Sequence, residues 1–290
     1  KAAAFEPQLP QTDILLGSAG LITALVDLDG KYGRRFDCSR LLEIAIRHGD
    51  FLLSSAVRSE EGWSWETIPV PVHRNLTGYA HGVSGIICAL AELSRATGED
   101  RFATAVEEGL RYEQSQFSPE SGNWRDYRAD AAEANEEAYQ FGWCHGAPGI
   151  GMARFRLIEL GFDSPEIRRD LDVALKTTTR KLEYADSAGQ RDFCICHGLA
   201  GNAELPLLVS QWSGQEPLRE SADRIGQFGI NEFEETGKPW PYGLGGTGET
   251  PTLFCGMACI GYFYLRLSRP DRVPSILLLR PPHDGSATPA

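Results

Sequence analysis

The sequence has no apolar run long enough to cross a membrane. Its longest apolar-leaning stretch near the end, residues 253–265, covers 13 residues and stops at Arg266, whereas a membrane span needs about 20. The stretch instead predicts a buried helix. The start of the chain also lacks the basic segment and apolar core of a secretion signal. We therefore expect a cytoplasmic protein without a membrane span and, because it begins with Lys1, a piece of a longer one.

Basic residues are scarce relative to acidic ones. The 290 residues include 28 Lys and Arg against 40 Asp and Glu, which gives a formal net charge of −12. Nucleic acids and anionic lipid surfaces attract positively charged proteins. The composition therefore argues against a nucleic-acid partner. A chain of this length can nevertheless bury a sizeable core, as expected of a globular protein.

The cysteines do not form the pattern of a disulfide framework. They are odd in number, irregularly spaced and set in a large chain, which favours reduced thiols. Cys38, Cys88 and Cys259 lie in apolar helical settings and are expected in the core. We also expect Cys194 and Cys255 to pack in the core, with a role as auxiliary metal ligands as the alternative. The seven are Cys38, Cys88, Cys144, Cys194, Cys196, Cys255 and Cys259.

Five similar glycine-containing stretches recur along the chain. Each holds a glycine followed by an apolar segment with helical spacing, and the glycines are 52 to 65 residues apart. A period of this length indicates a repeat architecture. The five stretches are "LLGSAGLITAL", "AHGVSGIICAL", "CHGAPGIGMAR", "CHGLAGNAELP" and "FCGMACIGYFY", and their first glycines are Gly17, Gly82, Gly146, Gly198 and Gly256.

Amphipathic segments at 39–56, 100–117, 164–182 and 216–228 separate these apolar helices. Alternating inner and outer helices describe an open solenoid or a closed α/α barrel, and the very apolar inner helices favour closure. We therefore predict an all-α fold, an α/α toroid, in a domain spanning residues 1–280. Two aromatic-rich stretches beside the repeats are expected to form strands or ordered loops. The tail at 281–290 is expected to be disordered.

Equivalent residues at the starts of the inner helices should gather around one mouth of an α/α barrel. The residues just before the repeat glycines include His81, His145 and His197, and cysteines precede the last two as Cys144 and Cys196. Thiolate and imidazole ligands suit Zn²⁺, and three protein ligands with one open position are typical of a catalytic zinc site. We choose Cys144, Cys196 and His197, although His145 and His197 are equivalent in the repeat. The alternative is that these residues only pack in the core.

Four stretches together resemble the lanthionine synthetase C-like cyclase family over residues 11–280. They are "GYAHGVSGI", "GWCHGAPGIGMAR", "CHGLAGN" and the ending "GETPTLFCGMACIGYFYLRLSRPDRVPSILLL". The closing "VPSILLL" resembles the end of bifunctional lanthipeptide synthetases, in which a dehydratase domain precedes the cyclase. The resemblance implies a toroid of seven repeats, of which five are present here, so the cyclase domain would be incomplete at its N-terminal end.

The resemblance also implies a zinc-dependent reaction. Peptide cysteines would add to dehydroalanine or dehydrobutyrine in a dehydrated precursor peptide and form thioether rings. Cys144, Cys196 and His197 match the zinc ligands, His81 matches a histidine that transfers protons, and Asp13 resembles the active-site aspartate. His145 is a second candidate for proton transfer. Two departures are Gln140, where stand-alone cyclases have a catalytic arginine, and Cys259, where the last repeat usually has a glycine.

Two other functions remain open from the sequence. Some relatives are glutathione-binding proteins that add this small thiol to dehydro residues, and a non-catalytic zinc-binding or peptide-binding toroid would carry the same repeats. Carbohydrate-active α/α barrels are a weaker option because they rely on paired carboxylates. They leave the two Cys-His-Gly motifs, at 144–146 and 196–198, unexplained.

Overall fold

The structure is a computed structural model that describes residues 11–33, 36, 39–70, 74–128, 139–184, 192–244 and 250–279. The predicted disordered tail at 281–290 and the predicted core residue Cys38 lie outside these ranges. The chain forms two compact units. The first contains Lys1–Phe117 and Asp126–Ala138, and the second contains Ser118–Arg125 and Tyr139–Ala290.

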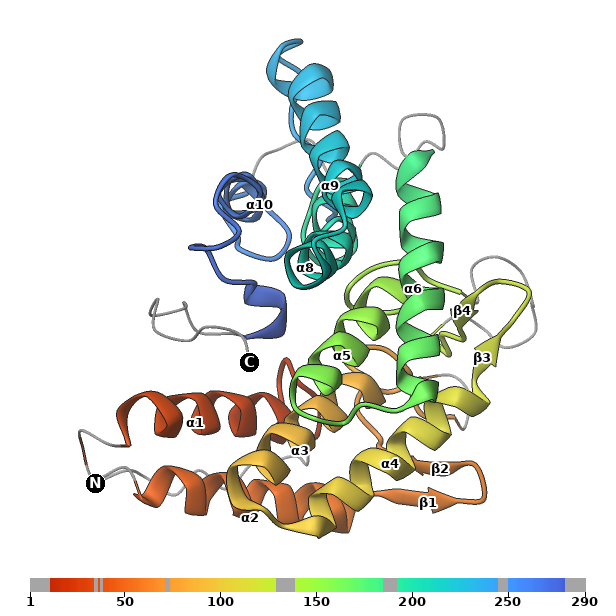
Figure 1. Ribbon diagram of the computed structural model, residues 1–290, viewed down its shortest axis with the longest axis vertical. Coiled ribbons are helices and arrows are strands. Elements are labelled where there is room, and N and C mark those ends of the chain that lie inside the picture. Colours follow the sequence, from red (N-terminus) through yellow and green to blue (C-terminus); the bar gives the residue numbers. More distant parts are fainter. Residues whose placement is uncertain are drawn as a thin grey trace. The chain divides into compact units, whose positions relative to one another are not determined.

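The first unit is built from helix pairs with a small hairpin (Figure 1). Helix α1 packs against α2 and α3, and α3 packs against α4. The antiparallel hairpin pairs Arg58 with Trp63, and its second strand lies against α4. The elements are α1 (Ser18–Tyr32), α2 (Ser39–Ser55), β1 (Val57–Ser59), β2 (Gly62–Ser64), α3 (Val83–Thr97) and α4 (Asp100–Ser115).

The second unit repeats the pairing of an apolar helix with an amphipathic one. Helix α5 packs on α6, α8 packs on α9, and α10 contacts α7 and α9. The elements are β3 (Phe117–Ser118), β4 (Asn123–Trp124), α5 (Ala147–Glu159), α6 (Pro165–Glu183), α7 (Leu199–Asn202), α8 (Glu204–Ser213), α9 (Glu216–Gly229), the π-helical turn η2 (Ile230–Glu234), α10 (Met257–Ser268) and the 3₁₀ turn η3 (Ile276–Leu278). The first residue of β3, Phe117, belongs to the first unit. Strands β3 and β4 pair with each other.

The repeat glycines mark the helix starts, as predicted. Each is the residue immediately before a helix. In α3 every residue from Val83 to Leu93 is buried, as expected of an inner helix. The predicted outer segments form α2, α4, α6 and α9 within two residues of the expected bounds. Helix α6 begins as its sequence predicts, with the Ser164 hydroxyl accepting the backbone N–H of Ile167 and Pro165 at the first position.

Two buried ion pairs connect helices of the second unit. Arg154 of α5 donates from Nε to Asp170 of α6 at 3.1 Å, and Arg266 of α10 donates from Nε to Glu204 of α8 at 2.8 Å. All four side chains are almost fully buried. Removing one partner of such a pair typically costs about 3–5 kcal/mol because a buried charge is left behind. The pairs therefore fix how these helices align.

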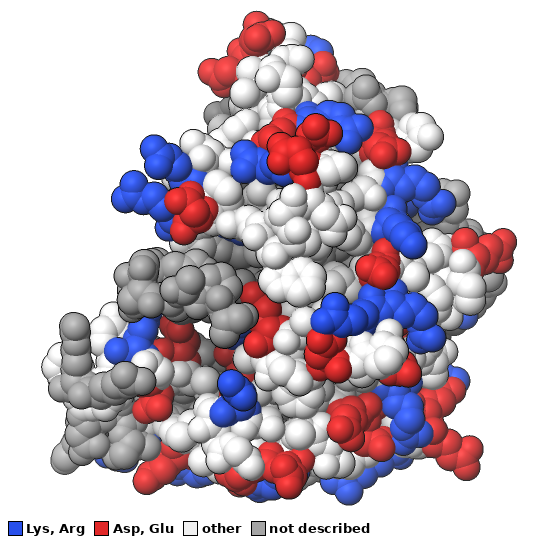
Figure 2. Space-filling model, viewed as in Figure 1, with Lys and Arg blue, Asp and Glu red and all other residues white. Residues whose placement is uncertain are grey.

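Acidic and basic side chains lie interspersed on the face of the molecule shown in Figure 2. The exposed ion pairs of the second unit include Arg219–Asp223 and Arg168–Asp163. Within the described ranges, no helix has both the length and the apolar character required to span a bilayer.

Candidate metal centre

Cys144, Cys196 and His197 come together in the second unit. One sulfur from each cysteine and one ring nitrogen of His197 lie within 4.8 Å of one another. A backbone hydrogen bond connects the two contributing segments, because the N–H of Cys144 donates to the carbonyl of Cys196 at 3.1 Å. A Cβ atom on Gly142 would stand 2.8 Å from the Cα of His197. This close approach of two loops therefore requires a glycine.

Trp143, next to the first cysteine, anchors its segment. The indole is buried, and its Nε1 donates to the carbonyl of Leu277 in η3 at 3.0 Å. The ring also lies 5.4 Å from that of Phe254, centroid to centroid. The segment that carries Cys144 is thus held by residues near the end of the described chain.

A carboxylate holds the His197 ring in place. Nε2 of His197 lies 3.0 Å from Oδ2 of Asp192 and 3.1 Å from the carbonyl oxygen of Gly243. The other oxygen of Asp192 accepts the backbone N–H of Cys194 at 2.9 Å. A neutral ring that donates from Nε2 carries its lone pair on Nδ1. The arrangement resembles the carboxylate–histidine pairs that orient metal ligands.

Asp192 and Gly243 had not been identified from the sequence. Asp192 lies five residues before His197, outside the Cys-His-Gly motif, and Gly243 belongs to a loop 46 residues further along the chain. Gly243 adopts φ +84°, a conformation that favours glycine. No spacing rule links either residue to the ligands, so only the folded chain identifies them.

The protonation of the three groups is strongly coupled. A hydrogen bond from Cys196 holds the pKa of Cys144 well below its ordinary value, and His197 lowers it further. The pKa of the Cys196 thiol is raised by that same hydrogen bond and by burial. The pKa of His197 is raised, first by its hydrogen bond with Asp192 and then by the neighbouring thiols. Without a metal ion, the site therefore favours a Cys144 thiolate beside an imidazolium.

This donor set fits a zinc ion. With Zn–S distances near 2.3 Å and Zn–N distances near 2.0 Å, tetrahedral donors stand about 3.3–3.8 Å apart. Donor atoms within 4.8 Å of one another need only small adjustments to reach this geometry. Three protein ligands would leave a fourth position for another molecule. That pattern is typical of catalytic zinc sites rather than structural ones.

His81 and Asp13 form a separate pair in the first unit. Nδ1 of His81 lies 2.8 Å from Oδ2 of Asp13, and the other oxygen of Asp13 accepts the backbone N–H of Leu16 at 2.7 Å. Asp13 is buried, whereas the side chain of His81 is 20% exposed. Thr67 donates from its hydroxyl to the carbonyl of His81 at 2.5 Å. Asp13 thus both caps a turn and orients the ring.

The other residues singled out in the sequence are not members of the group formed by Cys144, Cys196 and His197. His145 is buried, and its carbonyl accepts the N–H of Gly142 at 2.9 Å. Cys88 and Cys259 are buried, as predicted. The expectation of core packing is met for Cys194, which is buried, but Cys255 is only half buried. Both sulfurs lie within 4.8 Å of a ring nitrogen of His197 and of each other.

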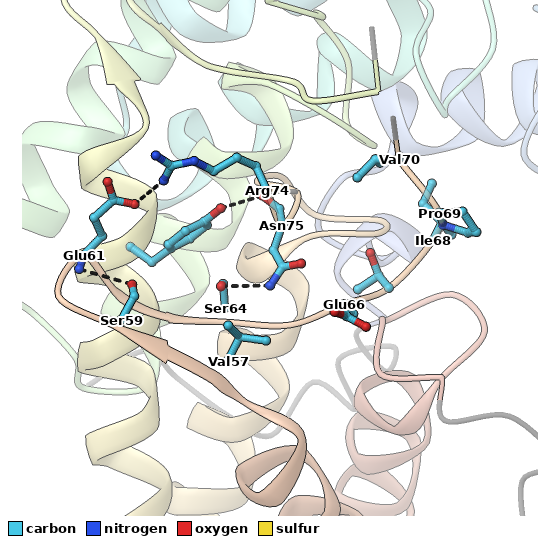
Figure 3. Close-up of a pocket in the computed structure, with 12 residues that line it drawn as sticks. Val57, Ser59, Glu61, Ser64, Glu66, Ile68, Pro69, Val70, Arg74 and Asn75 are labelled. Carbon is cyan, nitrogen blue, oxygen red and sulfur yellow. Dashed lines mark hydrogen bonds and ion pairs between the residues drawn. The ribbon is translucent and has the colours of Figure 1, made fainter. Parts of the chain in front are cut away.

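A cavity of about 620 Å³ lies in the first unit beside the β1–β2 hairpin (Figure 3). Glu61 and Arg74 form an ion pair at one side, and Tyr112 donates to the carbonyl of Asn75 at 2.6 Å. The Asn75 side chain in turn donates to the Ser64 hydroxyl at 3.0 Å. Among the described residues that line it there is no cysteine or histidine. The cavity is therefore distinct from the candidate metal centre.

The sequence pattern of the lanthionine synthetase C-like proteins matches residues 2–278. The chain belongs to this family. Over 202 residues it is 25% identical to the lacticin 481/lactococcin biosynthesis protein LcnDR2 of Lactococcus lactis subsp. lactis, covering 67% of the chain and 18% of that protein. It is 29% identical over 198 residues to the glutathione S-transferase LANCL1 of Danio rerio, covering 67% of the chain and 44% of that protein. The LanC-like chain thus spans less than half the length of these curated relatives.

Among solved structures, nisin cyclase has a similar fold. The TM-score is 0.62 at 17% identity, over 93% of the chain and 67% of nisin cyclase. A cellobiose 2-epimerase from Bacillus thermoamylovorans matches with a TM-score of 0.50 at 10% identity, over 74% of the chain and 59% of the epimerase. The similarity to nisin cyclase confirms the predicted all-α fold class of the α/α toroid.

Proposed function

We propose that this LanC-like chain is a zinc-dependent lanthipeptide cyclase. It would close thioether rings by adding cysteine thiolates of a dehydrated precursor peptide to dehydroalanine or dehydrobutyrine. The observation that carries the proposal is the group formed by Cys144, Cys196 and His197, which would hold a zinc ion through three ligands and leave it open to a substrate thiol. Membership of the lanthionine synthetase C-like family supports a lanthionine-forming reaction rather than another use of the metal.

Zinc would supply the deprotonation that the reaction needs. A peptide thiol with a pKa of about 8.5 is only a few per cent thiolate at neutral pH, and coordination to the metal deprotonates it. Cys144, Cys196 and His197 would hold the ion, and Asp192 would keep the His197 ring oriented. In the reaction a bond forms between the substrate sulfur and the β-carbon of the dehydro residue, and a proton is added at the α-carbon.

We assign that proton to His81. Asp13 holds Nδ1 of the ring, so Nε2 is the atom that would deliver the proton. His145 is the second candidate, although its burial hinders exchange of protons with solvent. The dehydrated precursor itself would come from a dehydratase, which we propose precedes the cyclase in the full-length protein, within the cytoplasm.

Incubation with a peptide that carries one dehydroalanine and one cysteine tests the proposal. Ring closure removes the free thiol without changing the mass, so a thiol-alkylating reagent no longer adds to the product. We expect cyclisation that stops when zinc is removed by a chelator and returns when zinc is restored. Unchanged alkylation of the peptide in the presence of the zinc-loaded chain would contradict the proposal.

The similarity to LANCL1 favours glutathione addition as the second candidate function. The same incubation with glutathione separates the two reactions. Glutathione addition leaves the peptide cysteine open to alkylation and increases the mass by one glutathione. A chain that binds zinc and the peptide but yields neither product would be a non-catalytic binding protein.

The His81→Ala variant tests the proton donor. A general acid typically contributes a factor of about 10² to 10⁴ to the rate. We expect the variant to bind zinc normally and to cyclise the peptide slower by this factor. Cyclisation at the unmodified rate would make His81 a structural residue.

A further inference from the structure

A second group of soft donors adjoins the candidate zinc site. Cys194, Cys255 and His197 each offer one donor atom, and these atoms lie within 4.8 Å of one another. Cys194 is buried just before α7, and Cys255 is half buried just before α10. His197 is the one residue shared with the Cys144–Cys196 group. The five donors do not form a single group at this spacing, so one ion cannot bind them all.

A carboxylate oxygen lies beside two members of this second group. Oδ2 of Asp192 lies 3.0 Å from Nε2 of His197 and 3.5 Å from the sulfur of Cys194. The two thiolates and the imidazole of the group are all zinc ligands, and the thiolates make it selective for soft cations.

Gly243 leaves room beside Cys194 and His197 of this group and beside Asp192. A Cβ atom added to Gly243 would stand 2.6 Å from Oδ2 of Asp192 and 2.9 Å from both the sulfur of Cys194 and Nε2 of His197. The three donor atoms therefore surround one small volume that any other residue would fill. The glycine keeps that volume open to an ion.

We propose that Cys194, Cys255 and His197 form a second zinc position, beside Asp192, that competes with the first position for His197. A neutral imidazole has one lone pair, so it serves one ion at a time. The second equivalent of zinc therefore binds more weakly than the first. Filling the second position draws His197 away from Cys144 and Cys196. Excess zinc then inhibits ring closure, a consequence that rests on the proposed cyclase function.

Titration of the reduced, metal-free chain with Zn²⁺ tests the site without any activity measurement. We expect two equivalents by calorimetry, the second at least about 10-fold weaker, and a matching two-step rise in thiolate-to-metal absorbance when Cd²⁺ replaces zinc. The Cys255→Ser variant should bind one equivalent. Cys259→Ser is the matched control, because Cys259 lies in the same helix region outside both groups and should leave two equivalents. Saturation of the unmodified chain at one equivalent would overturn the proposal, as would a second equivalent that survives Cys255→Ser.

The activity arm tests the competition for His197. Cyclisation by the unmodified chain and by Cys259→Ser should rise with the first equivalent of zinc and fall at least several-fold with excess zinc. In Cys255→Ser the same excess should cause no fall. Two bound equivalents without inhibition in the unmodified chain would overturn the shared role of His197. Absence of cyclisation at every zinc level would contradict the proposed function and leave the stoichiometry to decide the second site.

Discussion

The second unit contains the same tripeptide twice, as Cys144-His145-Gly146 and Cys196-His197-Gly198, and the two copies have different environments. Each glycine stands immediately before a helix, and each cysteine belongs to the candidate metal group. The histidines diverge. His145 is 2% exposed and lies outside the group, whereas the side chain of His197 is 40% exposed and lies within it.

The backbone and one carboxylate account for this difference. The φ angle is +98° at Gly146 but −92° at Gly198, so the backbone that follows each histidine runs in a different direction in the two copies. Asp192 is placed to accept from His197. A Cys-His-Gly motif therefore brings a thiol to the candidate metal group in both copies, but it brings a histidine only where the backbone path and a neighbouring carboxylate direct the ring toward the group.

Replacing each histidine in turn should give the largest difference in zinc affinity between the two Cys-His-Gly copies. His197→Ala removes a ligand, so we expect zinc affinity to fall by more than about 100-fold, since even outer-shell partners are worth 10–100-fold. His145→Ala should keep zinc and lower the free energy of unfolding by about 2–4 kcal/mol through the cavity it leaves. Competition with a chromophoric chelator and denaturant unfolding measure the two effects. Equal zinc loss in both variants would mean that the copies are equivalent.

The two cysteines should differ in reactivity in the metal-free chain. The lowered pKa of Cys144 favours its thiolate, while the raised pKa of Cys196 favours the protonated thiol. At pH 7 we expect iodoacetamide to modify Cys144 faster by a factor on the order of 100. The rate at Cys144 should fall only as pH drops through its lowered pKa, and the rate at Cys196 should rise only above its ordinary value of 9.0. Peptide mapping at several pH values checks both trends, and equal rates at pH 7 would refute the coupling.

Asp192→Ala should weaken zinc binding by about 10–100-fold, the usual effect of losing the partner of a ligating histidine. Asp192→Asn keeps an acceptor of the same size, so we expect a smaller loss. Asp13→Ala is the control, because Asp13 also holds a histidine ring, that of His81, but His81 is not a candidate zinc ligand. We expect this variant to keep the zinc affinity of the unmodified chain. Chelator competition on all three variants decides whether the two carboxylates have different roles.

Gly243→Ala should have the smallest effect, a fall in zinc affinity of about 10-fold. Its new methyl group would press on Asp192, Cys194 and His197. Gly237→Ala is the control, since Gly237 also has a positive φ, +67°, but a Cβ there meets nothing within 4 Å. Both variants should lose about 1–2 kcal/mol of unfolding free energy from the backbone conformation. If the control weakens zinc binding equally, backbone strain rather than contact with the ligands is responsible.

The helix boundaries and the meeting of Cys144 with Cys196 could be predicted because they depend on local and repeated signals. Glycines at regular intervals mark the inner helix starts, and the Ser164-Pro165 cap marks an outer one. The choice of His197 over His145 could not be made with certainty, because it depends on the conformation of Gly146 and on Asp192. The grouping of Cys255 with Cys194 depends on loops that meet only in the folded chain. Neither feature leaves a periodic pattern in the sequence.

The hydrogen bond between Trp143 and Leu277 can form only late in synthesis. The two residues are 134 positions apart, so the carbonyl that accepts the indole N–H of Trp143 is made only when almost the whole described chain has been synthesised. At about 5–20 residues per second, that interval is roughly 7–27 s. The candidate ligands themselves are made much earlier, between residues 144 and 197. A nascent chain can therefore expose these thiols before the hydrogen bond that supports Cys144 can form, and we expect zinc bound at that stage to be held less tightly than in the folded protein.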